Sequence, residues 1–212
     1  MLFRSLGLRP ILRLLSSAPR CRCRLNSNVR HHGNTFVYVL RREFALLAVA
    51  WPLAPASAAP FAAPNTVEIS ATLVTSGQPS AKALAALSEE GFQAVIYLAP
   101  SSVTDAVANE PELLKAQGIE FVHIPIPFME PTESHFAQFS EQLTRLNGRK
   151  VLVHCQVNMR ASTMVFLYRV IVGKESATIA YSSVTKVWSP QGPWLNLVKR
   201  LLAKYEVDFE PF

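Results

Sequence analysis

Cysteine is scarce in this chain, and its distribution leaves a single thiol for chemistry. Only three of the 212 residues are cysteines, and two of them, Cys21 and Cys23, lie near the amino terminus. We expect that part of the chain to be removed, so Cys155 is the one cysteine of the predicted mature protein. A single thiol cannot form a disulfide within the chain or resolve a two-cysteine redox cycle. It is therefore either a buried structural residue or kept for chemistry.

Acidic residues are nearly absent from the first 58 positions, where Glu43 is the only one against nine arginines. This segment accounts for the formal charge of +6 of the whole chain. From Ala59 onward, 14 acidic residues slightly outnumber 12 basic ones. A domain with that balance is not expected to bind nucleic acid.

Long hydrophobic runs are lacking as well. The apolar stretch Phe44–Trp51 is too short to span a bilayer, two arginines precede it, and the small residues Ala56-Ser57-Ala58 follow it. This arrangement is typical of a secretory signal peptide. We therefore expect residues 1–58 to be a leader, and the mature protein to be periplasmic or secreted without a stable membrane span. Residues 1–39, rich in Arg and Ser, also suit a mitochondrial transit peptide, which stays open as an alternative.

Apolar periodicity predicts strands that alternate with helices over residues 67–212, after a Pro/Ala-rich linker over 59–66. This order predicts a single α/β domain with a mostly parallel central sheet flanked by helices. The expected strands cover 67–74, 92–98, 119–124 and 150–154, and the expected helices 81–90, 110–117, 133–146, 161–172, 174–187 and 193–205.

The segment around Cys155 combines a nucleophile with a loop suited to anions. The cysteine follows a predicted strand and precedes an apolar helix that begins near Ala161. Backbone N–H groups and the positive end of the helix point to this place, so we expect the thiol to ionise readily. Arg160 adds a fixed fork of donors for an oxyanion.

These residues carry a family resemblance. His154-Cys155, four residues and then Arg160, between a strand and a buried helix, resemble the cysteine-dependent protein phosphatase superfamily. The turn Ser76–Pro79 and the strand Gly91–Leu98 more specifically resemble the phosphatase-like domain of beta-lactamase-hydrolase-like proteins, also labelled a sulfur transferase family. The resemblance implies a protein tyrosine or dual-specificity phosphatase-like fold over residues 67–212 and a hydrolase without cofactor or metal.

The resemblance also implies roles for single residues. Cys155 is the nucleophile for a small anionic or phosphorylated substrate, and Arg160 binds its oxyanion. His154 orients the loop, and Gln78 lines the site from the first loop. The cradle is completed by the backbone N–H groups of Gln156, Val157, Asn158 and Met159.

The general acid is less clearly marked. The family places an Asp on the loop after the preceding strand, but the loop over residues 127–133 has none. Glu130 is the best candidate there, followed by Glu133. Phe128 and Met129 on the same loop are expected to form a hydrophobic lip beside the site.

Three features depart from the phosphatase pattern. Dual-specificity phosphatases have five residues between Cys and Arg, whereas this chain has four, a spacing found in rhodanese-type sulfurtransferases. Asn158 stands near the usual glycine, and Ala161 replaces the usual hydroxyl residue. A phosphatase-like hydrolase is the first prediction. A sulfurtransferase with a Cys155 persulfide and a non-catalytic anion-binding module are the alternatives.

Overall fold

The computed structural model describes residues 61–212, so the predicted leader over residues 1–58 lies outside the described residues. The strands are β1 (Val67–Ser70), β2 (Leu73–Ser76), β3 (Ala94–Tyr97), β4 (Glu120–His123) and β5 (Val151–His154). The helices are α1 (Ala81–Leu84), α2 (Glu110–Ala116), α3 (Glu133–Arg145), α4 (Met159–Ile171), α5 (Ala177–Thr185) and α6 (Gly192–Lys204). None of these helices is long and apolar enough to cross a membrane.

The five strands form one sheet in the order β1-β2-β5-β3-β4. Strands β2, β5, β3 and β4 are parallel, and β1 pairs with β2 in the antiparallel direction. The predicted α/β domain with a mostly parallel sheet is therefore confirmed. Strand β5 is central, so its carboxyl end lies between the ends of β2 and β3.

Two predicted elements differ from the structure. The single strand expected over 67–74 is a hairpin of β1 and β2, with a turn at Ala71-Thr72 held by the Thr72 N–H, which donates to Ser70 Oγ at 3.2 Å. The helix expected over 81–90 ends at Leu84 and continues as turns to Gly91. Its predicted cap is present, because Ser80 Oγ accepts from the Ala83 N–H at 3.1 Å.

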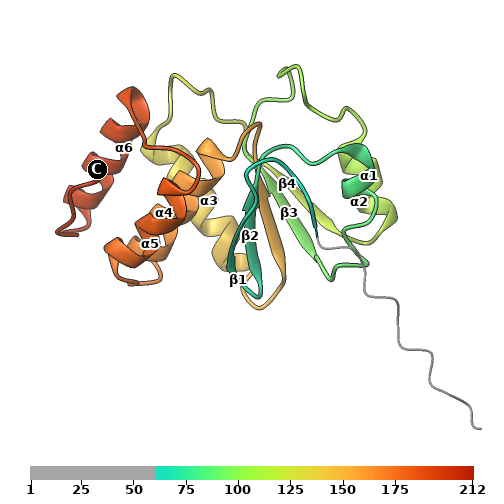
Figure 1. Cartoon of the computed structure of the whole chain (residues 1–212), viewed down its shortest axis with the longest axis horizontal. Helices are drawn as coiled ribbons and strands as arrows, with labels where there is room; N and C mark the ends of the chain where they lie inside the picture. The colour runs from blue at the N-terminus through green and yellow to red at the C-terminus, as the bar shows by residue number, and fades with distance from the viewer. Residues whose placement is uncertain (1–60) are drawn as a thin grey trace, which may run out of the picture. The chain divides into compact units, whose positions relative to one another are not determined.

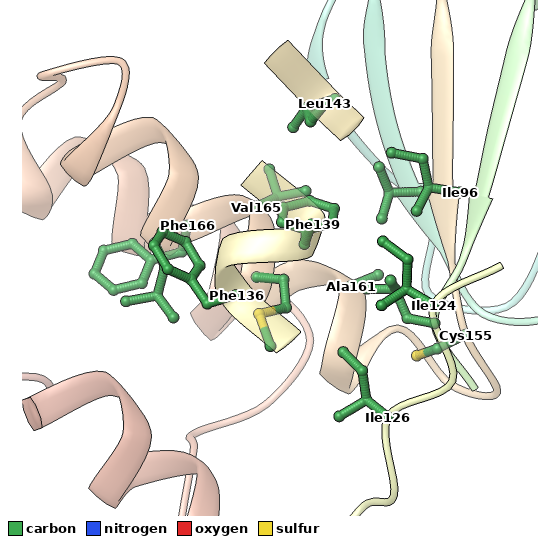
Figure 2. Packing of buried hydrophobic residues seen from close by; sticks show 14 of the residues in the cluster. Ile96, Ile124, Ile126, Phe136, Phe139, Leu143, Cys155, Ala161, Val165 and Phe166 are labelled. Atoms are coloured by element: carbon green, nitrogen blue, oxygen red, sulfur yellow. The ribbon is translucent and has the colours of Figure 1, made fainter. Parts of the chain in front are cut away.

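Helices cover both faces of the sheet (Figure 1). Helices α1 and α2 pack on one face over a small apolar cluster, and α3 to α6 lie on the other side over the main core. Helix α4 is buried along most of its length, as its apolar sequence predicts. Figure 2 shows Cys155 beside Ile126 and Ala161 at the margin of the main core.

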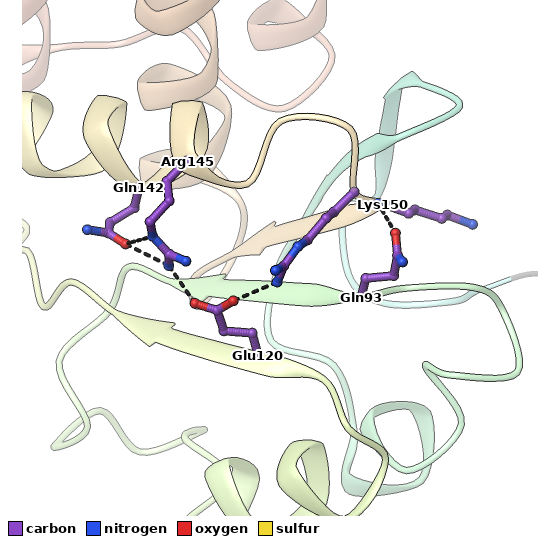
Figure 3. A network of polar contacts seen from close by, with 6 residues as sticks. Gln93, Glu120, Gln142, Arg145 and Lys150 are labelled. Atoms are coloured by element: carbon purple, nitrogen blue, oxygen red, sulfur yellow. Dashed lines mark hydrogen bonds and ion pairs between the residues drawn. The ribbon is translucent and has the colours of Figure 1, made fainter.

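Charged groups tie the amino-terminal end of the parallel strands to the helices (Figure 3). Glu120, the first residue of β4, accepts from Arg145 at 2.5 Å and from Arg149 at 2.6 Å. The hydrogen bond from Arg145 is the main reason that the pKa of Glu120 is lowered. Ligands of open α/β sheets bind at the opposite end, beyond the carboxyl ends of the strands, so the candidate site is expected there.

Candidate active site

The loop from Cys155 to Arg160 joins β5 to α4 at the carboxyl edge of the sheet. Cys155 has no exposed surface, and its backbone N–H donates to the Ser76 carbonyl at 3.3 Å. Helix α4 begins at Met159, two residues earlier than predicted, so the loop is short and Arg160 belongs to the first helical turn. The thiol thus lies at a strand end against the N-terminus of a helix.

Asn158 gives the loop its bend. Its φ of 71° lies in the left-handed region, where the family pattern has glycine and where Asn is tolerated better than most residues. The buried side-chain Nδ2 donates to the Asn65 carbonyl at 2.6 Å and to Thr75 Oγ1 at 3.1 Å. Both the conformation and the two hydrogen bonds fix the direction in which α4 leaves the loop.

Residues before β1 support the loop from outside. The Gly77 N–H donates to the Pro64 carbonyl at 2.6 Å, and Asn65 Nδ2 donates to the Val157 carbonyl at 3.1 Å. A Cβ at position 77 would come within 2.7 Å of the Gln156 carbonyl oxygen, so only glycine fits there. Residues 64–65, part of the predicted linker, are therefore in direct contact with the site.

Arg160 is held in one orientation. It is 4% exposed, its Nε donates to the Ile126 carbonyl at 2.9 Å, and its Cζ lies 5.1 Å from the centre of the Phe128 ring. Within the described part of the chain its terminal nitrogens make no hydrogen bond. A guanidinium fixed through Nε and stacked on a ring presents its remaining donors to an anion.

His154 belongs to a buried polar group that sequence reasoning missed. Glu110, the first residue of α2, is 2% exposed and accepts from His154 Nε2 at 2.7 Å and from Gln78 Nε2 at 2.9 Å. The side chains of Gln78 and His154 thus meet at Glu110, and His154 directly precedes Cys155. The sequence gives no sign that Glu110 is buried, because acidic residues are common in the first turn of solvent-exposed helices, where they interact with the positive helix end.

Tyr97 packs against this group. Its ring stacks between those of His123 and His154, with centroids 5.1 and 4.7 Å away. Burial first, and then the charges of Glu110 and Asp105, raise the pKa of Tyr97 to about 12. His123 Nε2–H donates to the Ala99 carbonyl at 2.8 Å, so this ring has a structural partner. No group of three potential metal ligands occurs within residues 61–212.

The candidate general acids differ in placement. Glu130 is exposed on the loop before α3, and its carboxylate makes no hydrogen bond to the described residues. Glu133 belongs to the surface of α3, where a hydrogen bond from Lys204 lowers its pKa. Asp105, on the loop after β3, was not predicted. It accepts from Gln156 Nε2 at 2.9 Å and so contacts the residue that follows Cys155.

The hydroxyls after Arg160 do not replace the missing one at Ala161. Ser162 Oγ and Thr163 Oγ1 both donate to the Met159 carbonyl, at 3.2 and 2.9 Å. Both protons are therefore used within the first turn of α4.

The chain is similar in sequence and fold to known proteins. A family model described as DSP-PTPase phosphatase fused to NAD+ kinase matches residues 59–192. A crystal structure of a candidate phosphatase (DUF442) from Shewanella putrefaciens CN-32 is 28% identical, with a TM-score of 0.62 over 68% of this chain and 94% of that one. No curated protein matches.

Two more distant structures share the fold alone. Kinase associated phosphatase is 18% identical, with a TM-score of 0.55 over 65% of this chain and 89% of that one. The core catalytic domain of the PP-IP phosphatase SIW14 from S. cerevisiae is 15% identical, with a TM-score of 0.54 over 71% and 99%. The structure of kinase associated phosphatase carries a serine in place of that protein's catalytic-site cysteine.

Proposed function

The chain belongs to the family described as DSP-PTPase phosphatase fused to NAD+ kinase, a family of hydrolases, and we propose that it cleaves phosphate monoesters through a Cys155 thiolate. The observation that supports this mechanism best is the loop itself. A buried thiol at a strand end, a left-handed Asn158 and an Arg160 held through Nε within one short loop support this proposal.

The proposed reaction has two steps. The Cys155 sulfur forms a bond to phosphorus while the bond from phosphorus to the alcohol oxygen breaks, and a general acid protonates that oxygen. Water then attacks phosphorus and gives a proton to the same carboxylate, which now acts as a base; the S–P bond breaks, and phosphate leaves with the thiolate and the acid restored. Arg160 and the backbone N–H groups of Gln156 to Met159 bind the phosphate oxygens in both steps.

Two carboxylates compete for the role of general acid. Glu130 lies on the loop where the family places its acid, but its side chain has no contact that would direct it to the thiol. Asp105 is hydrogen-bonded to the side chain next to Cys155, which puts it at the rim of the anion loop. We favour Asp105 for this reason and keep Glu130 as the second candidate.

Leaving-group dependence tests the mechanism. Asp105→Asn should slow the hydrolysis of phenyl phosphate, whose phenolate is a poor leaving group, by about 10²–10⁴-fold. It should change little for 4-nitrophenyl phosphate, whose phenolate leaves without a proton. Glu130→Gln is the matched comparison, and Cys155→Ser should abolish both reactions. A selective loss in Glu130→Gln would reverse the assignment, and full activity in Cys155→Ser would exclude the thiolate mechanism.

Sulfur transfer is the second candidate, favoured by the four-residue spacing between Cys155 and Arg160. In that reaction the thiolate takes the outer sulfur of thiosulfate and releases sulfite, which requires no general acid. Intact-protein mass spectrometry after exposure to thiosulfate decides the question. A gain of one sulfur atom that Cys155→Ser lacks, without phosphatase activity, would replace the phosphatase proposal.

A further inference from the structure

An uncharged groove runs beside the anion loop. It has a volume of about 610 Å³ and is lined by Phe128, Met129, Met159, Trp188 and residues of the segment 189–193. We call it the apolar groove. None of its lining residues carries a charge. Met129 leaves 69% of its surface exposed there, so its side chain is available to a ligand.

The aromatic wall of the apolar groove is fixed from behind. Trp194 Nε1 donates to the Phe128 carbonyl at 2.8 Å, and Trp188 Nε1 donates to Thr163 Oγ1 at 3.3 Å. The ring of Phe128 lies 5.9 Å from each of the two indoles. Because both indole N–H groups are bonded within the protein, Trp188 has only ring carbons left for a ligand, and the wall needs no rearrangement.

Two residues that line the apolar groove are neighbours of Arg160. Met159, one of its lining residues, directly precedes Arg160 in the loop. Phe128, another, lies under the Arg160 guanidinium at 5.1 Å. A phosphate bound by Arg160 would therefore direct its ester oxygen, and the alcohol attached to it, toward the groove.

We propose that the apolar groove binds the alcohol part of the substrate, and that the substrate is a monoester with a single phosphate and an uncharged, apolar alcohol. The proposal rests on the proposed phosphatase function. Arg160 offers its remaining donors to one phosphate group, and the groove offers no cation for a second. Additional phosphates or carboxylates on the alcohol would lose their water there without a partner.

A series of n-alkyl phosphates tests the proposal, from ethyl to octyl, each below its micelle concentration. The alcohols of this series leave with nearly equal difficulty, so the chemical step is constant and kcat/KM reports binding. Burial of a methylene corresponds to about 0.8 kcal/mol, so kcat/KM should rise by up to about fourfold per carbon until the groove is filled. Propyl phosphate should be preferred over glycerol 3-phosphate, which has a similar size but two hydroxyls.

Two variants locate the effect. Met129→Gln should reduce the ratio of octyl to ethyl phosphate turnover, because it replaces an exposed apolar wall with an amide. Ile179→Gln is the control, since Ile179 on α5 is 62% exposed and does not line the groove. If kcat/KM were equal along the series, or if both variants lowered the octyl-to-ethyl ratio equally, the proposal that the groove binds the alcohol would be wrong. The proposed phosphatase function would be unaffected by either result. Preference for a phosphopeptide with acidic neighbours would also overturn the proposal for the groove.

A binding experiment tests the groove separately if the protein has no phosphatase activity. If no phosphate is released from any ester, binding of ethylphosphonate and octylphosphonate to the full chain is followed by quenching of tryptophan fluorescence. Octylphosphonate binding at least tenfold tighter, with the difference reduced in Met129→Gln, would keep the groove as a ligand site. Equal affinities would remove it.

Discussion

The contribution of Asn158 to the loop can be tested by measuring the free energy of unfolding of two variants. Replacement by alanine keeps the backbone in the left-handed region, which costs a residue with a Cβ about 1–2 kcal/mol. It also removes the hydrogen bonds to the Asn65 carbonyl and Thr75 Oγ1, at about 0.5–1.5 kcal/mol each. Asn158→Ala should therefore lower the free energy of unfolding by at least about 1–3 kcal/mol, the contribution of the two hydrogen bonds. Asn158→Gly loses the same hydrogen bonds but removes the Cβ, so its decrease should be smaller than that of Asn158→Ala by about 1–2 kcal/mol.

Urea denaturation of both variants measures these decreases, and their difference isolates the backbone. That difference should be about 1–2 kcal/mol in favour of glycine. Inorganic phosphate should bind Asn158→Gly more tightly than Asn158→Ala, because the bend of the anion loop depends on the same φ. Variants of equal stability would refute the argument that the left-handed conformation of residue 158 shapes the loop.

Two further variants address the buried polar group around Glu110. Glu110→Gln should lower the free energy of unfolding by about 1–3 kcal/mol, because its amide would place a donor against Gln78 Nε2. Glu112→Gln on the exposed side of α2 should stay within about 0.5 kcal/mol of the wild type by the same denaturation assay. The folded protein raises the pKa of Tyr97 from 10.0 to about 12, so the unfolded chain loses this proton at a lower pH than the folded one. The free energy of unfolding therefore keeps its full value below about pH 10 and decreases as the pH rises toward 12. Tyr97→Phe should remove this part of the alkaline loss, and an unchanged pH profile of unfolding would contradict the shift.

The strand-loop-helix arrangement around Cys155 could be predicted from local sequence, because it lies within one short segment. Cys155, Asn158 and Arg160 are brought together by a single strand-loop-helix connection, so their types and spacing were sufficient to predict the loop. The left-handed Asn158 follows from the same logic, because few residues other than glycine adopt that conformation.

Residues that reach the site from elsewhere could not be predicted in this way. Glu110 and Asp105 precede their partners His154 and Gln156 by 44 and 51 positions, and nothing in their own neighbourhoods fixes that pairing. It arises because β3 lies next to β5 in the sheet, which brings the loop after β3 over the anion loop. The order of strands depends on the whole fold, so it cannot be predicted from the residues of any one segment.

The hairpin was missed for a different physical reason. Apolar alternation continues from β1 through Ala71 into β2, so the period of two does not change at the turn. The turn contains neither Gly nor Pro and is held by a serine hydroxyl instead. A turn of this kind leaves no mark in the hydrophobic pattern.

The contacts of Pro64 and Asn65 lead to a final prediction about where the mature chain can begin. Three hydrogen bonds join these two residues to Gly77, Val157 and Asn158, so they support the anion loop from outside. A chain that starts at Ala59, as the predicted signal cleavage requires, keeps all three. A chain that starts at Val67 loses them and leaves the Gly77 N–H and the Asn158 amide without these partners.

We therefore expect the Val67 chain to bind inorganic phosphate more weakly and to release phosphate from 4-nitrophenyl phosphate more slowly than the Ala59 chain. Asn65→Ala in the Ala59 chain removes one side-chain hydrogen bond and should have a smaller effect in the same direction. Thermal unfolding of each chain separates loss of the loop from loss of the fold. Equal phosphate affinity for the Ala59 and Val67 chains would show that the segment before β1 is only a linker, because the anion loop would then keep its shape without any of the three contacts.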